Sequence, residues 1–221
     1  MADLLYRWPV NATVGQRVPK EKFYEHGAVK PAVRELFVSE VQRITWAYKL
    51  AENTINLPGS EQVPEIQVFV LDAKQGDVSD AVLSAIDKAV QFPLVFEITR
   101  TAVGQAEARM VATHKQLGTG VPKLGEYFST GWLPANTARQ SLPTAIALPA
   151  LYTELLQPLT PLASRPGEEL SEVTGRVNAV RRLEREIVSL ERKLRTEPQF
   201  NRKVELRRML KTKQNELDQQ R

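Results

Sequence analysis

The chain has 221 residues, which is enough for one globular domain with an appendage or for two small domains. It contains no cysteine, so disulfides, thiol nucleophiles, iron–sulfur clusters and cysteine-based zinc sites are excluded. Its two histidines are too few for a poly-histidine metal site, and we expect neither a metal nor a cofactor. No apolar stretch has the length of a signal-peptide core or a membrane span, so we expect a cytoplasmic protein without a membrane partner.

The net charge of +4 comes entirely from the last quarter of the chain. Residues 168–221 contain 14 basic and 10 acidic residues, whereas residues 1–167 contain 16 of each. A body that is neutral overall lacks the clustered, uncompensated cations that a broad nucleic-acid-binding face requires.

The first part of the chain is expected to hold one long helix. Proline and glycine interrupt residues 1–30, which we take as irregular. Pro31 suits the first position of a helix, and apolar residues then recur at a spacing of 3.6 residues, which predicts a helix over residues 31–51. The apolar positions are Val33, Leu36, Phe37, Val41, Ile44 and Tyr48.

The middle of the chain predicts a crossover between two parallel strands. Residues 65–71 form a continuous apolar run of the kind found in buried strands. Ser79 can cap a helix that ends before Pro93, and residues 94–98 form a second strand. A strand, a helix and a strand in about 33 residues fit a right-handed βαβ unit within one sheet.

Further strands are predicted at residues 109–114 and 127–132, around a glycine-containing loop at residues 118–125. A phosphate-binding loop requires a helix after it, whereas the segment after this loop has a strand pattern, so we expect a plain connection. Residues 148–156 predict a short helix. We therefore expect an α+β body over residues 1–157, with one mixed sheet and packed helices, followed by a proline-rich linker over residues 158–167.

Residues 168–221 have the apolar spacing of a coiled coil. Two amphipathic helices are separated by a break at Glu197-Pro198, which predicts an antiparallel helical hairpin. The apolar face along which the two helices pack is called the seam. The alternative is a homodimer in which two chains pair through this seam. The seam residues are the predicted partner-binding positions Leu183, Ile187, Leu190, Leu194, Leu206 and Leu210.

Arg181, Arg185 and Arg192 lie opposite the seam and form a basic line on the outer face of the first hairpin helix. Cations at a repeating spacing can contact phosphates, but interleaved acids at i,i+4 are typical of a solvated helix surface. These arginines are therefore candidate phosphate contacts, and the solvated surface remains the alternative.

An acid-x-Lys tripeptide at the end of the first buried strand provides the one candidate catalytic site. In metal-dependent nucleases, such a tripeptide holds a cation and a water molecule together with a second carboxylate. Asp72 and Lys74 supply the tripeptide, and Glu97 on the neighbouring strand is the available second acid. The metal-dependent nuclease is therefore the enzymatic alternative, although the sequence favours a protein that is not an enzyme.

Four separated blocks carry a resemblance to a known family: residues 17–24, residues 44–50 with 53–57, residues 85–96 and residues 199–206. Together they resemble an uncharacterised bacterial family, a domain of unknown function of about this length. Members of that family are often encoded beside DEAD/DEAH helicases and DNA methyltransferases in restriction-like phage-defence gene clusters. The resemblance implies an accessory subunit, and it supplies no catalytic residues.

The sequence thus predicts a non-catalytic adaptor of a phage-defence complex. We expect its hairpin to dock onto a larger protein, a helicase or a DNA methyltransferase. The alternatives are the nuclease around Asp72 and direct nucleic-acid binding by the basic line of the hairpin.

Overall fold

A computed structural model of the chain describes residues 4–26, 29–162, 165, 168 and 170–221. It divides into two compact units, residues 1–161 and residues 162–221. The helices and strands, with their bounds, are η1 Val10–Ala12, β1 Thr13–Arg17, α1 Lys20–His26, α2 Pro31–Glu40, β2 Val41–Leu50, α3 Glu52–Ile55, β3 Ile66–Ala73, α4 Asp80–Ala89, β4 Leu94–Ala102, β5 Gln105–Gln116, β6 Lys123–Ser129, β7 Leu133–Pro134, α5 Leu148–Leu156, η2 Gln157–Leu159, α6 Leu170–Thr196 and α7 Phe200–Gln220.

The body is built on one mixed sheet with the strand order β1-β2-β3-β4-β5-β6, and β7 pairs with the end of β5. Neighbouring strands are antiparallel except β3 and β4, which are parallel and are connected through α4. The parallel pair confirms the predicted strand–helix–strand crossover. The predicted α+β class with a mixed sheet is likewise confirmed.

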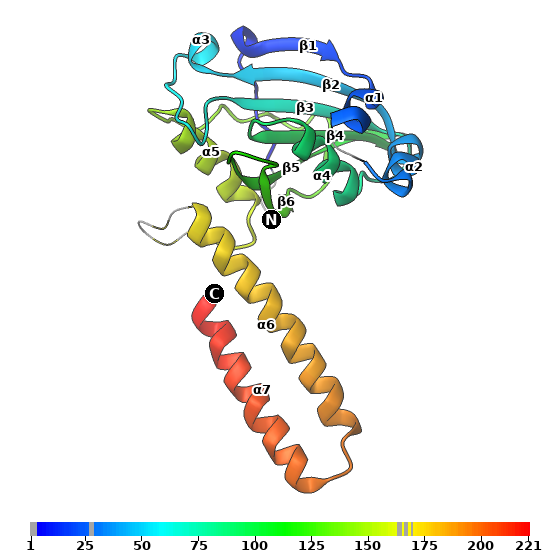
Figure 1. Ribbon diagram of the computed structural model, residues 1–221, viewed down its shortest axis with the longest axis vertical. Coiled ribbons are helices and arrows are strands. Elements are labelled where there is room, and N and C mark those ends of the chain that lie inside the picture. The colour runs from blue at the N-terminus through cyan, green and yellow to red at the C-terminus, as the bar shows by residue number, and fades with distance from the viewer. Residues whose placement is uncertain (1–3, 27–28, 163–164, 166–167, 169) are drawn as a thin grey trace. The chain divides into compact units, whose positions relative to one another are not determined.

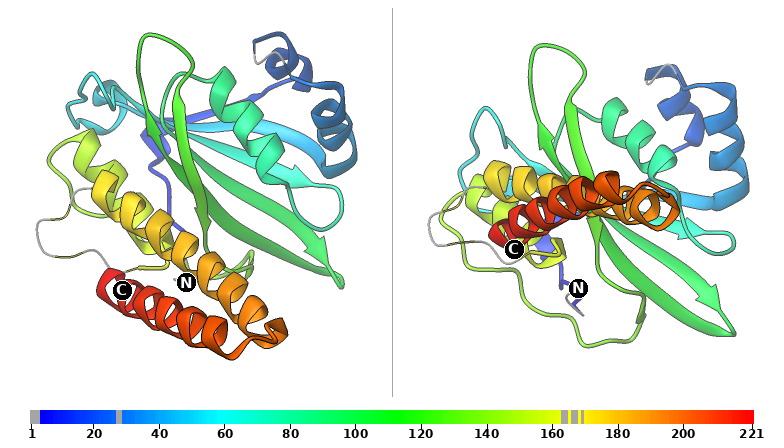
Figure 2. Two further views of the ribbon diagram at one scale, coloured as in Figure 1. Left: turned by 60° about the horizontal axis from the view of Figure 1, so that its bottom comes forward. Right: turned by 90° about the horizontal axis from the view of Figure 1, so that it is seen from below.

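Helices α1, α2 and α4 cover one face of the sheet, and α5 lies on the other side (Figure 1, Figure 2). Under α1, α2 and α4, the apolar side chains of alternate strand residues form the main core, in which Phe37, Phe69 and Phe96 are the large members. Burying each large apolar side chain of this kind stabilises the fold by about 1.5–3 kcal/mol. On the second face, Trp8 from the N-terminal segment contacts Glu97 of β4.

The predicted long helix over residues 31–51 is wrong in its second half. The helix α2 ends at Glu40, and the chain continues directly into β2, the strand that pairs with both β1 and β3. Residues 1–30 are also more regular than expected, since they contain β1 and α1. The sheet therefore extends two strands beyond the predicted crossover.

The remaining boundaries differ by a few residues. The strand expected at 127–132 is β6, which begins at Lys123 and ends at Ser129, so the connection from β5 is shorter than the predicted loop. The helix predicted at residues 148–156 is α5 with the same bounds. Within the predicted linker 158–167, residues 163, 164, 166 and 167 lie outside the described residues.

The second unit is an antiparallel hairpin of α6 and α7, as predicted. Lys213 of α7 pairs with Glu186 of α6 at 3.2 Å, and Arg176 near the start of α6 donates to the main chain of Gln220 near the end of α7. Contacts that run from low numbers on one helix to high numbers on the other define the antiparallel arrangement. Among the described residues, no helix is long and apolar enough to cross a membrane.

Candidate functional site

A cavity of about 580 Å³ lies where the parallel strands β3 and β4 end. In open sheets with parallel strands, ligands bind beyond the carboxyl ends of those strands. We call this cavity the polar trough. It is lined by Arg17, Gln42, Arg43, Asp72, Ala73, Thr99, Arg100, Thr101, Ala106, Glu107 and Ala135.

The predicted site residue Asp72 lies in the trough and is held by two neighbours. Its carboxylate accepts one hydrogen bond from Thr99 Oγ1 at 2.7 Å and another from Arg43 Nε at 2.6 Å. The strand register explains both contacts, because Arg43 on β2 and Thr99 on β4 are directly opposite Asp72 on β3. Both carboxylate oxygens are therefore occupied by protein donors.

Glu97 lies on the same face of the sheet, because it is two residues before Thr99 on β4. It is only 5% exposed, so its carboxylate lies in the buried part of this face. Trp8 Nε1 donates to it at 3.2 Å, and both terminal nitrogens of Arg139 also donate to it. These contacts raise the pKa of the Arg139 guanidinium, through the hydrogen bonds first and the charge of Glu97 as well.

Lys74 follows β3 and is exposed. Its main-chain N–H donates to the carbonyl oxygen of Glu40 at 2.7 Å, and its ammonium is close enough to Lys20 to lower the pKa of that lysine, after burial as the larger cause. Lys20 donates to the carbonyl oxygens of Phe37 and Val41, and Lys74 does not line the trough.

The structure thus brings Asp72 and Glu97 to one face of the sheet, but Asp72 pairs with Arg43 and Glu97 pairs with Arg139. Lys74 does not lie with them in the trough. A metal-dependent nuclease needs several oxygen ligands around one point. Within the part of the chain that the structure describes, no three acidic or histidine side chains gather in a way that could hold a metal ion. The nuclease alternative has no supporting geometry there.

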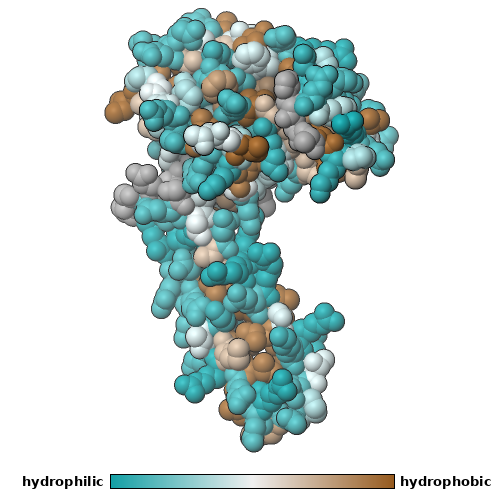
Figure 3. Space-filling model, in the orientation of Figure 1, coloured by the Kyte–Doolittle hydropathy of each residue, from teal (hydrophilic) through white to brown (hydrophobic). Residues whose placement is uncertain are grey.

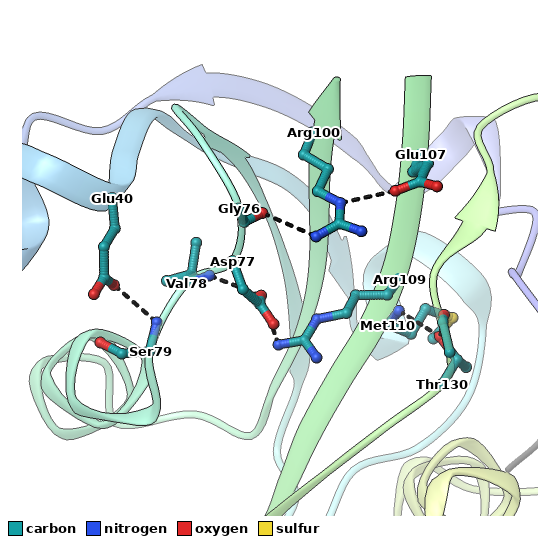
Figure 4. Close-up of polar contacts among 11 residues, drawn as sticks. Glu40, Gly76, Asp77, Val78, Ser79, Arg100, Glu107, Arg109, Met110 and Thr130 are labelled. Carbon is teal, nitrogen blue, oxygen red and sulfur yellow. Dashed lines mark hydrogen bonds and ion pairs between the residues drawn. The ribbon is translucent and has the colours of Figure 1, made fainter. Parts of the chain in front are cut away.

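On the opposite face of the same strand ends, two arginines clamp the loop between β3 and α4 (Figure 4). Arg109 pairs with Asp77 at 2.7 Å, and Arg100 pairs with Glu107 at 2.8 Å while donating to the carbonyl of Gly76. Both guanidinium groups lie over the ring of Trp132, at 5.1 and 3.8 Å from its centre. Burial lowers the pKa of Arg109, and Asp77 opposes that shift.

The predicted seam residues of α6 and α7 pack against each other within the hairpin. Leu183, Ile187 and Leu217 pack together with Val180, and Leu210 contacts this cluster. Leu190 is buried too, while Leu194 and Leu206 are half-buried near the break between the helices. The seam side chains therefore cover one another within a single chain, and pairing of two chains through the seam would require the hairpin to open.

The outer surface of the hairpin carries both basic and apolar exposed side chains. Of the basic line, Arg185 and Arg192 are exposed, and Arg181 is half-buried with its carbonyl oxygen accepting from Arg185 Nε. Figure 3 shows apolar side chains interrupting the hydrophilic surface toward the end of the hairpin where its helices are joined.

A second stripe, on α7, is exposed along its whole length. Phe200, Val204, Arg207 and Lys211 follow one another at spacings of four, three and four residues, which places them on one face of the helix. Phe200 is 74% exposed and Val204 is 49% exposed. We call these four residues the α7 stripe.

Sequence reasoning missed the α7 stripe and most of the trough. The stripe could have been found in the sequence, because its residues recur at helical spacing on a face of the helix different from the face that carries the seam positions Leu206 and Leu210. The trough has no such signal in the linear sequence, since its residues come from β1 to β5 and from Ala135 after β7, and they meet only through the pairing of the strands.

The chain belongs to the family described as "Domain of unknown function (DUF4391)", whose model matches residues 7–217. The match covers the body and nearly all of the hairpin, so both units belong to the family pattern. No curated protein and no solved structure matches the chain.

Proposed function

We propose that the protein is a non-catalytic adaptor that docks onto a larger protein through the α7 stripe of its hairpin. The observation that carries the proposal is the exposure of Phe200 and Val204 side by side on a helix whose own seam is already filled. An exposed aromatic next to an aliphatic side chain is a typical anchor of a protein interface.

The charge of the stripe indicates the chemistry of the partner. Arg207 and Lys211 make no ion pair within the described part of the chain, whereas other hairpin cations such as Lys213 and Arg221 are paired. The complementary surface is an apolar pocket bordered by carboxylates. Acidic residues around a pocket would increase the association rate and fix the orientation of the hairpin.

The resemblance noted in the sequence suggests which protein carries that surface. Family members encoded beside DEAD/DEAH helicases and DNA methyltransferases point to one of these two enzymes as the partner. The adaptor would then be part of a restriction-like phage-defence complex, in which the partner performs the chemistry.

The test measures binding of the full-length protein to the purified helicase and methyltransferase encoded beside it. We expect the double variant Phe200→Ser/Val204→Ser to weaken binding at least tenfold, because truncating interface anchors removes about 2 kcal/mol or more. The matched control is Val121→Ser/Ile146→Ser, which removes two strongly exposed apolar side chains from the body. The control should bind as the wild type does.

Two results would overturn the proposal. One is a partner affinity that the stripe variant leaves unchanged, and the other is the absence of binding to both enzymes. Direct binding to an oligonucleotide with a steep loss of affinity in salt, removed by Arg185→Ala/Arg192→Ala, would instead assign the hairpin to nucleic acid.

A further inference from the structure

We infer that the polar trough binds a sugar-phosphate group, a function beyond that of the hairpin adaptor. Its main polar side chains lie on one face of the sheet. Arg17 on β1 is opposite Thr45 of β2, which is two residues from Arg43, and Arg43 is opposite Asp72. The strand alternation therefore places Arg17, Arg43 and Asp72 on the same face near the strand ends.

The balance of charge in the trough selects an anion. Asp72, the carboxylate on this face, already has an arginine because it accepts from Arg43, and the side chain of Glu107 is paired with Arg100 on the opposite face. Arg17 remains, exposed and without an ion pair in the described part of the chain. An uncompensated guanidinium beside a second one attracts an anionic ligand, and the paired carboxylates are poor ligands for a cation.

Asp72 fixes the orientation of the Arg43 guanidinium in a way that suits such a ligand. The carboxylate holds Arg43 through its Nε atom, and the side chain of Arg43 is still 58% exposed. The two terminal nitrogens lie outside this contact. A planar guanidinium fixed at Nε can present those nitrogens as a fork, which matches the geometry of two phosphate oxygens.

The rest of the lining indicates what accompanies the phosphate. Thr99, Thr101 and Gln42 supply hydroxyl and amide groups, and three alanines leave space between them. No aromatic and no large aliphatic side chain of the described residues lines the trough, so it offers no stacking surface for a nucleobase. A volume of about 580 Å³ exceeds that needed for a bare anion and suits a hydroxyl-bearing ring joined to a phosphate.

Two sources share this chemistry, a free sugar phosphate and the backbone of a nucleic-acid strand. The experiment titrates the full-length protein with ribose 5-phosphate, ribose, inorganic phosphate and a single-stranded oligonucleotide, and calorimetry measures the binding. We expect ribose 5-phosphate to saturate the protein, inorganic phosphate to bind at least tenfold more weakly, and ribose not to bind.

The variants Arg17→Ala and Arg43→Ala should each lower the affinity at least tenfold. Thr101→Val, which removes one hydroxyl at nearly constant volume, should weaken ribose 5-phosphate more than inorganic phosphate. The charge-matched control is Arg182→Ala, which removes an exposed arginine from the hairpin. Each variant is first checked for an unchanged melting temperature.

One outcome is that only the oligonucleotide saturates the protein and that both Arg17→Ala and Arg43→Ala lose this binding. That outcome supports the same site, with a nucleic-acid strand as the source of the sugar-phosphate group. The absence of saturable binding by any of these probes overturns the inference. Binding that both arginine variants leave unchanged also overturns it. Because no hairpin residue is altered in Arg17→Ala or Arg43→Ala, either result is separate from the test of the adaptor proposal.

Discussion

Lys115 and Asp87 form an ion pair at 3.0 Å with both side chains completely inside the body. Lys115 on β5 also donates to the carbonyl oxygens of Val90 and Phe92, and Asp87 on α4 accepts from the hydroxyl of Tyr127 at 2.6 Å. The pair therefore fixes α4 to the sheet beneath it. Burial raises the pKa of Asp87, while the charge of Lys115 and the hydrogen bonds from Tyr127 and Lys115 oppose that shift.

The first prediction concerns this pair. Lys115→Met leaves the Asp87 carboxylate buried without its cation, and removing one member of a buried pair lowers the free energy of unfolding by about 3–5 kcal/mol. The double variant Asp87→Asn/Lys115→Met removes both charges at similar volume and should recover more than half of that loss. Urea unfolding at pH 7 measures both values. A single variant as stable as the wild type would contradict the prediction.

The same variant has a pH signature with a definite sign. Without Lys115, the pKa of Asp87 rises further above its unfolded value of 3.8, so the folded state binds a proton more readily than the unfolded state. The contribution of Asp87 is then favourable at low pH and is lost as the pH rises through the folded pKa. The stability difference between wild type and Lys115→Met should therefore shrink as the pH falls from 7 toward 4. A difference independent of pH would show that the Asp87 carboxylate does not cause the loss.

His114 on β5 carries the second prediction. Partial burial lowers the pKa of His114 below 6.5, so the unfolded state takes up a proton first as the pH falls. The contribution of His114 is fully present above pH 6.5 and is lost as the pH falls through 6.5 toward the folded pKa. We expect His114→Gln to flatten the pH dependence of the urea midpoint between pH 7.5 and 5.5. Gln116→Ala, which changes an exposed side chain without a titratable group on the same strand, is the control and should keep the wild-type slope.

The features that could be predicted from the sequence are those that depend on local interactions. The hairpin was predictable, because its heptad spacing and the break before Pro198 act over a few residues. The crossover from β3 to β4 was predictable for the same reason. The trough was not, since it depends on which residues of β1, β2, β3 and β4 come opposite one another, and register leaves no mark in a single strand.

The strand β2 shows why a periodic pattern misled. Its fully buried residues are Val41, Ile44, Ala47 and Leu50, three apart, which resembles a helical stripe. Register shifts between positions 41 and 43 and between positions 46 and 48 interrupt the usual alternation of two. The β-branched and aromatic residues of this segment favour a strand, and they outweigh the apolar spacing.

The loop between β3 and α4 gives the third prediction. Asp77 accepts from Arg109 and from the main-chain N–H of Val78, both at 2.7 Å. Asp77→Ala releases this loop from β5, and we expect amide exchange in residues 74–79 to become about tenfold faster, the effect of losing roughly 1.4 kcal/mol of local stability. Gln75→Ala, an exposed change in the same loop, is the control. Equal exchange in the two variants would show that Asp77 does not hold the loop.

The last prediction tests whether the seam holds the hairpin closed. Leu217 near the end of α7 packs against Leu183 and Ile187 of α6, and all three are at most 9% exposed. Leu217→Ala removes these contacts and should lower the stability of the α6–α7 pairing by about 2–4 kcal/mol, seen as faster amide exchange along α7. Met209→Ala, at an exposed position of the same helix, should leave exchange unchanged. If Leu217→Ala instead increased the molecular mass in solution, the opened seam would be pairing with a second chain, as the homodimer alternative requires.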